Sequence, residues 1–149
     1  MADSDETPTI TNESDAAWFA KQHKVVVAYL RSQGCDHAGV SLEPRWFLSP
    51  YLAIWAVRSK ANPDAVGWWA ISGDVPTDYM TAACDIRNNA DVLAAFGTRW
   101  SKSAESMSRG EYFGIGKSQD ARELAPLLQT RAEMLHELSE QVRAEESKG

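Results

Sequence analysis

The sequence predicts an α+β fold, in which a tryptophan-rich antiparallel β-hairpin, or a small sheet built on it, is covered by three main helices. Two apolar runs of strand length are separated by a turn signal, and helical apolar spacing occurs before and after them. The 149 residues suffice for one domain, which at this size buries about two-thirds of its unfolded surface. We expect a single domain over residues 12–145, with a disordered acidic leader at 1–11 and a disordered tail at 146–149.

The first expected element is a helix that starts at about Asn12 and ends at Gly34. Thr11 or Asn12 can cap its start, and Gly34 can adopt the left-handed conformation that ends many helices. Its apolar face comprises Trp18, Phe19, Val25, Val26, Tyr29 and Leu30. The following residues 35–50 are punctuated by glycine and proline, which predicts a loop.

The two strands of the hairpin are expected at residues 51–57 (YLAIWAV) and 66–72 (VGWWAIS). Both faces of the first strand are apolar, which is typical of a central strand or of one covered on both sides. Asn62-Pro63-Asp64 lies between the strands and is a strong turn signal. Because an isolated hairpin is only marginally stable in water, helices must cover it.

The second half of the chain is expected to be helical. Asn88 or Asn89 can cap a helix that ends at Gly110, and Ser118 is expected to open the final helix, with Pro126 in the first turn of its main segment. The final helix carries a stripe with spacings of four and three, at Leu124, Leu128, Arg131, Leu135, Leu138 and Val142, which is apolar except for Arg131. This stripe favours packing within the fold, and the alternative is a homodimer through the C-terminal helix, since coiled coils use the same spacing.

The most unusual segment is GWWAISGDVPTDY, residues 67–79, which we expect to lead into a short helix through Ala83. Gly73 indicates a backbone position that needs a positive φ or a close approach. Thr77 or Asp78 can cap the short helix. One interpretation of the segment is therefore structural: a strand end, a tight turn and a capped helix.

The other interpretation is a binding site at the mouth of a cleft. Its candidate residues are Trp68, Asp74, Thr77, Asp78 and Tyr79. The surrounding segment 64–85 contains four aspartates and no basic residue. Acidic and aromatic side chains together suit a cationic group, which favours a basic protein partner or a small amine. The structural alternative is that Arg45 and Arg58 neutralise these acids within the fold.

The charge distribution and the cysteine count argue against several classes of protein. The net charge is −6, but five acids and no base lie in residues 1–15, so the remaining chain is nearly neutral and has no basic stripe for nucleic acid. No run of 18 apolar residues exists, so no transmembrane helix or membrane partner is expected, and the acidic N-terminus is unlike a secretory signal. Two cysteines are too few for a secreted disulfide scaffold, so we expect a cytoplasmic protein.

Residues suited to catalysis or metal binding are few. Cys35, Asp36 and His37 lie together, and Cys84 and Asp85 could join them, but the spacing is not that of a structural zinc site. The sequence contains no Gly-rich phosphate loop, nucleophile elbow or paired metal-ligand motif. We therefore predict no catalytic residue, no metal ion and no cofactor.

Three stretches resemble a bacterial family of small proteins known only as a domain of unknown function. They are Pro44–Phe47 with Pro50-Tyr51 and Trp55-Ala56, the GWWAISGDVPTDY segment, and Leu124–Leu135. The resemblance covers most of the chain and implies no reaction, cofactor or catalytic residue. The pattern of Gly67-Trp68 followed by Ser72-Gly73-Asp74 also resembles a pattern in small acidic bacterial proteins linked to toxin immunity.

Together these observations predict a non-catalytic protein-interaction module, of immunity or adaptor type, that uses the acidic-aromatic segment 64–85. The alternative is a small-molecule-binding protein or an enzyme of unrecognised type. Its cleft would be formed by Asp74, Thr77, Asp78 and Tyr79, with the carboxylates as general acid–base groups.

Overall fold

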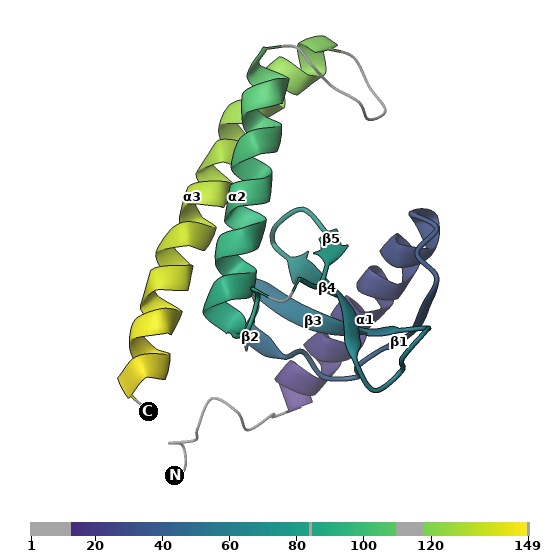
Figure 1. Ribbon diagram of the computed structural model, residues 1–149. Coiled ribbons are helices and arrows are strands. Elements are labelled where there is room, and N and C mark those ends of the chain that lie inside the picture. The colour runs from purple at the N-terminus through teal and green to yellow at the C-terminus, as the bar shows by residue number, and fades with distance from the viewer. Residues whose placement is uncertain (1–12, 84, 110–117, 149) are drawn as a thin grey trace. The chain divides into compact units, whose positions relative to one another are not determined.

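The computed structural model describes residues 13–83, 85–109 and 118–148, and within them it contains three helices and a small antiparallel five-stranded sheet (Figure 1). The predicted α+β fold is confirmed. The chain divides into two compact units, residues 1–82 and 83–149, which are described in turn. The predicted leader at 1–11 lies outside the described residues, and the predicted division into leader, domain and tail stays a prediction.

The sheet of the first unit is built on β3 (Leu52–Ser59) and β4 (Val66–Gly73), the two strands of the predicted hairpin. β5 (Asp78–Thr81) pairs with the other edge of β4. β1 (His37–Val40) and β2 (Trp46–Leu48) both pair with the remaining edge of β3, near its opposite ends. All pairings are antiparallel, so the hairpin is the centre of a larger sheet.

Two local predictions are wrong. Residues 35–50 contain β1 and β2 as well as loops, because both short strands are held by β3, which lies further along the chain. The expected short helix at 77–83 is instead β5, which pairs Asp78 with Ile71 and Tyr79 with Ala70. Threonine and tyrosine suit a strand, and Gly73 turns the chain back along β4. Neither Thr77 nor Asp78 therefore caps a helix.

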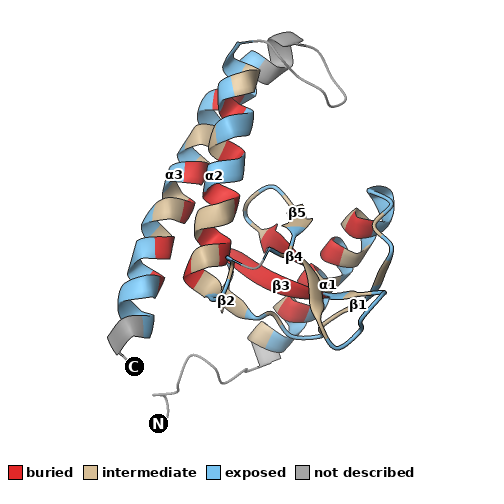
Figure 2. Ribbon diagram, in the orientation of Figure 1, coloured by how far each residue is buried: buried red, intermediate tan, exposed pale blue. Residues whose placement is uncertain are grey.

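Helix α1 (Glu13–Ser32) packs on one face of this sheet. The shared core consists of Phe19, Val26 and Leu30 from the helix with Ala53, Trp55, Val57 and Ala70 from the sheet. The indole N–H of buried Trp55 donates a hydrogen bond of 3.1 Å to the Ser72 hydroxyl, so the polar atom of this large side chain is satisfied. Residues 52–57 are all buried, as expected for a central strand (Figure 2).

The second unit consists of an antiparallel pair of helices, α2 (Asn89–Ser108) and α3 (Ser118–Lys148) (Figure 1). The predicted cap of α2 is confirmed, because the side chain of Asn88 accepts a hydrogen bond of 2.9 Å from the Asp91 backbone N–H. Buried residues of α2 recur at spacings of three and four, at Ala90, Leu93, Gly97, Trp100 and Ala104. Those of α3 lie at Ala125, Ala132, Leu135, Ser139 and Val142, with spacings of three and four after a first interval of seven. Such spacing is typical of coiled-coil packing, here within one chain.

The contact face of α3 differs from the predicted stripe at its start. Leu124 is exposed, and the buried position beside it is Ala125. Pro126 lies inside α3 rather than in a first turn. Small residues define this seam because the helices approach closely: a Cβ at Gly97 would lie 2.9 Å from the His136 ring and 3.1 Å from the Ala132 carbonyl oxygen.

Candidate functional site

The two aromatic residues among the candidates belong to the core rather than to an open surface. Trp68 and Tyr79 are half-buried and pack against the cluster shared by α1 and the sheet. The Tyr79 ring lies 6.0 Å from that of Tyr29, in an edge-to-face arrangement. Their main contribution is therefore packing, of the size expected for partly buried aromatic side chains.

The three polar candidates lie in or beside the turn between β4 and β5. Asp74 is exposed, and its backbone N–H donates a hydrogen bond of 2.7 Å to the Tyr51 carbonyl. Thr77 and Asp78 are half-buried, and an Asp78 carboxylate oxygen accepts a hydrogen bond of 2.8 Å from the Tyr79 backbone N–H. Since neighbouring strand residues point to opposite faces, Asp78 and Tyr79 project to different sides of the sheet.

The turn is fixed by Gly73, which has a φ of 127°. A Cβ at this position would collide with the Tyr51 carbonyl oxygen and lie 2.6 Å from the Cα of Leu52. The predicted need for a positive φ or a close approach is confirmed, and both apply. The backbone of residues 73–74 is therefore held rigidly against the start of β3.

Tyr51 is the residue that the sequence interpretation missed. Tyr51 is 56% exposed, and it stands one step beyond the register pair Leu52–Gly73, opposite Asp74. We call Tyr51, Asp74, Thr77 and Asp78 the Tyr51–Asp74 corner. The position of Tyr51 in the sequence could have indicated its exposure. It directly follows Pro50 and precedes the buried residues 52–57, so less of the sheet covers its side chain.

The four aspartates of segment 64–85 do not form one acidic patch. Asp64 precedes β4 and Asp74 follows it, so the eight residues of this strand separate them. At about 3.3 Å per residue this is about 26 Å. Asp64 therefore lies too far along β4 to act together with Asp74.

Arg45 and Arg58 do not neutralise these acids. The Arg45 guanidinium lies 5.1 Å from the centre of the Trp69 ring, a cation–π arrangement. Among the described residues, neither arginine forms an ion pair with a carboxylate. The indole N–H of Trp69 is buried and has no hydrogen-bond partner there.

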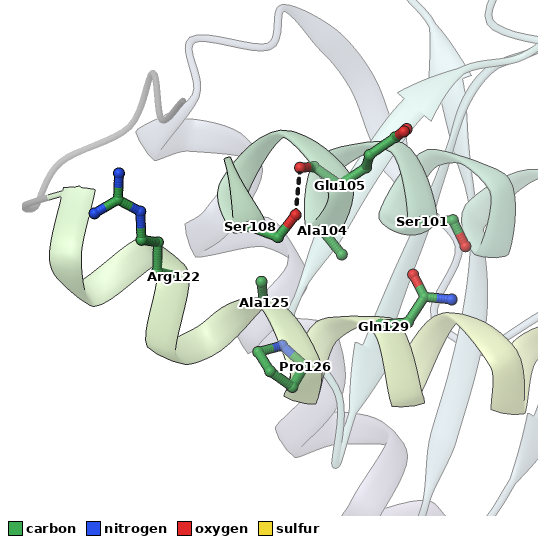
Figure 3. A pocket seen from close by; sticks show the side chains of 8 residues that line it. All are labelled: Ser101, Ala104, Glu105, Ser108, Arg122, Ala125, Pro126 and Gln129. Atoms are coloured by element: carbon green, nitrogen blue, oxygen red, sulfur yellow. Dashed lines mark hydrogen bonds between the residues drawn. The ribbon is translucent and has the colours of Figure 1, made fainter. Parts of the chain in front are cut away.

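The described residues form open grooves elsewhere, and the three described next are not lined by any of the five candidate residues. One of about 410 Å³ lies between α1 and residues 42–43 and includes Phe19 and His23. A second of about 540 Å³ is lined by Ser41, Leu42, Glu43, Pro44, Arg45, Ala56 and Arg58. The third, of about 510 Å³, lies between α2 and α3 (Figure 3). Its lining residues are Ser101, Ala104, Glu105, Ser108, Arg122, Ala125, Pro126 and Gln129.

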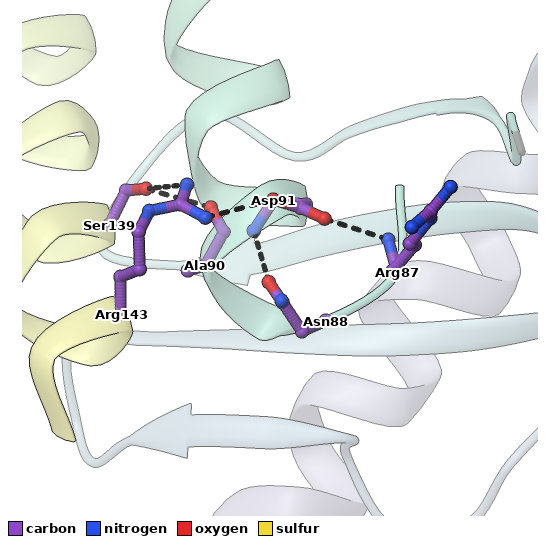
Figure 4. Close-up of polar contacts among 6 residues, drawn as sticks. All are labelled: Arg87, Asn88, Ala90, Asp91, Ser139 and Arg143. Atoms are coloured by element: carbon purple, nitrogen blue, oxygen red, sulfur yellow. Dashed lines mark hydrogen bonds and ion pairs between the residues drawn. The ribbon is translucent and has the colours of Figure 1, made fainter. Parts of the chain in front are cut away.

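The second unit contains a polar network that serves the fold (Figure 4). Asp91 accepts a hydrogen bond of 2.9 Å from the Arg87 backbone N–H and pairs with the Arg143 guanidinium at 3.2 Å. The Ser139 hydroxyl donates to the Ala90 carbonyl at 2.8 Å. The Arg87 N–H, helped by the Arg143 guanidinium, holds the pKa of the Asp91 carboxyl below its usual range. These contacts cap α2 and tie it to α3.

The residues of the Cys35-Asp36-His37 run have separate roles. Burial, helped by the charge of Asp36, raises the pKa of the Cys35 thiol, which keeps it protonated and weakly nucleophilic at neutral pH. Asp36 pairs with Lys60 at 3.2 Å, and His37 Nδ1 accepts a hydrogen bond from the Gly39 N–H. Cys84 lies outside the described residues. Within the part of the chain that is described, no three such side chains are grouped to hold a metal ion.

These features define a small α+β protein with a five-stranded sheet, a helical pair and open surface grooves. Residues 12–144 match the model of a family described as a domain of unknown function, DUF4826, and the chain belongs to this family. The predicted resemblance to an uncharacterised family is confirmed at this level. No curated protein and no solved structure matches the chain significantly. None of the described helices is long and apolar enough to cross a membrane.

Proposed function

We propose that this protein is a non-catalytic protein-interaction module, of immunity or adaptor type, that binds a basic segment of a partner protein at the Tyr51–Asp74 corner. One observation carries the proposal: the 2.7 Å hydrogen bond from the Asp74 N–H to the Tyr51 carbonyl. It holds an exposed carboxylate opposite an exposed aromatic residue on a rigid sheet.

This pairing suits the side chain of lysine or arginine. The carboxylate supplies an ion pair and the ring supplies a cation–π contact. Thr77 in the same turn and Asp78 at the start of β5 add further oxygen acceptors. Because Gly73 and the sheet already fix the backbone, little entropy is lost on binding. Each exposed ion pair contributes at most about 1 kcal/mol, so we expect weak, salt-sensitive binding.

The exposure of Asp74 favours binding over acid–base catalysis, which is most effective where a site positions the substrate and excludes water. The small-molecule or enzymatic alternative at Asp74, Thr77, Asp78 and Tyr79 stays a prediction. So do a cytoplasmic location and a homodimer through the C-terminal helix. Light scattering tests the homodimer, whose contact would have to use the part of α3 that does not pack on α2.

A labelled hexalysine peptide tests the proposal by fluorescence anisotropy. Asp74→Asn and Tyr51→Ala should each weaken binding at least about threefold, the effect of losing one exposed ion pair or cation–π contact. Asp64→Asn is the matched control, since it removes the same charge from an exposed position at the far end of β4. Equal weakening by Asp74→Asn and Asp64→Asn would mean that the peptide responds only to net charge, and the proposal would be wrong.

A further inference from the structure

The groove at Arg45 and Arg58 carries the opposite charge from the Tyr51–Asp74 corner. The groove lies between β3 and the segment 41–45, which connects β1 to β2. The Ser41 N–H donates to the Ala56 carbonyl at 3.3 Å, and the Arg45 N–H donates to the Ile54 carbonyl at 2.7 Å. The loop is therefore anchored to β3 on both sides of the groove.

Both arginines lie on the same side of the sheet as Trp69. Ala56 and Trp69 are a register pair, so they share one face, and Arg58 follows Ala56 by two residues on β3. Arg45 reaches the same face, because its guanidinium stands over the Trp69 ring. The Trp69 contact positions the Arg45 side chain in the absence of a carboxylate partner.

Positively charged side chains outnumber negatively charged ones in this groove. Two guanidinium groups face one carboxylate, that of Glu43, and neither arginine forms an ion pair among the described residues. An anionic ligand with oxygen acceptors would satisfy groups that the described chain leaves unpaired.

We propose that this groove binds carboxylate groups, and that its ligand is an acidic peptide segment of a partner protein. The Arg45 guanidinium stands over Trp69, whose register partner Ala56 lies two residues before Arg58 on β3, so both arginines line the same groove. Guanidinium groups bind carboxylates with two parallel hydrogen bonds, and exposed Leu42 supplies an apolar wall. This inference uses different residues from the proposed function and stands independently of it.

Titration with a labelled hexaglutamate peptide at low salt tests the inference. Arg45→Gln and Arg58→Gln should each weaken binding about threefold to tenfold, as expected for loss of one charge-assisted contact at a partly open site. Glu43→Gln should tighten binding, because it removes the competing carboxylate. Arg31→Gln is the matched control: it removes one positive charge from an exposed position on α1.

The pattern across the variants decides the outcome. Weakening by Arg45→Gln and Arg58→Gln with no change in Arg31→Gln supports a specific site. Equal weakening in all three would show attraction to net charge alone, and no measurable binding would also overturn the proposal. Competition with inorganic phosphate distinguishes a peptide from a small anion. If phosphate displaces the labelled peptide as well as unlabelled hexaglutamate does at the same total concentration of negative charge, the groove binds any small oxyanion and the peptide assignment is wrong.

Discussion

The two units of this protein use their polar side chains in different ways. In the second unit, Asp91, Arg143 and Ser139 bond to one another or to the nearby backbone, and together they tie α2 to α3. In the first unit, Asp74, Arg45 and Arg58 lie at the rim of the sheet without a carboxylate–guanidinium pair among the described residues. The polar groups of the second unit that bond within the fold contribute to its stability. The charged groups at the rim of the sheet are the ones that a partner could bind.

The two units also differ in how they fill their interiors. The core between α1 and the sheet depends on large aromatic side chains, with the fully buried Trp55 among them. The seam between α2 and α3 depends on small residues such as Gly97, Ala104 and Ala132, which let the helices approach. The core between α1 and the sheet should therefore lose stability when its side chains are shortened. The seam between α2 and α3 should lose stability when its side chains are enlarged.

Trp55→Ala should have the largest effect on stability. It removes a fully buried aromatic side chain and leaves the Ser72 hydroxyl without its donor, so we expect a loss of about 4 kcal/mol in the free energy of unfolding. Urea unfolding measures the total, and amide hydrogen exchange shows whether the sheet loses protection before the helical pair. Trp55→Phe should cost clearly less; equal losses for the two variants would contradict a role in filling the core.

Gly97→Leu should have the next largest effect, and its effect should fall on the helical pair. The new side chain must displace the His136 ring and meet the Ala132 carbonyl, so we expect a loss of about 2 kcal/mol despite the better helix propensity of leucine. Thr98→Leu, at an exposed neighbouring position, is the control and should change stability by less than about 0.5 kcal/mol. A stabilised Gly97→Leu protein would show that the seam is looser than the structure indicates.

Asp91→Asn should have a smaller effect that depends on pH. The carboxylate bonds to the Arg87 N–H and to Arg143 near the start of α2, so its loss should cost about 1 kcal/mol at pH 7. The pKa of Asp91 is lowered from 3.8 in the folded protein, so this stabilisation is complete above that value and is lost as the pH falls through the lower folded pKa. Urea unfolding at pH 7 and at successively lower pH should therefore show the difference from wild type shrinking only in acid. A difference that stays constant into acid would rule out the ionised carboxylate as its source.

Local patterns predicted much of the fold and less of the site. The β3–β4 hairpin was predictable because its apolar runs and its turn are contiguous in sequence. The α2 cap was predictable because Asn88 acts on a residue three positions away. β1, β2 and β5 were not, since each is too short to be stable alone and depends on pairing with β3 or β4.

The candidate site shows the same limit. The turn residues Asp74, Thr77 and Asp78 were recognised from composition, but their aromatic neighbour is Tyr51, which reaches Asp74 only through the β3–β4 register. Trp68 and Tyr79 were selected because they are close in sequence, whereas their side chains pack toward α1. Spatial neighbours across a sheet cannot be deduced from spacing along one strand.

Because β1 and β2 both pair with one edge of β3, that edge is not open to another molecule. A long, straight outer strand can recruit the same strand from another molecule and seed aggregates. Here the outer strands are short: β1 has four residues, β2 three and β5 four. The pairing of β1 with β3 is also irregular between His37 and Gly39. The tryptophan-rich strands, which have the composition most prone to such self-association, are therefore enclosed between short neighbours that offer little template for growth.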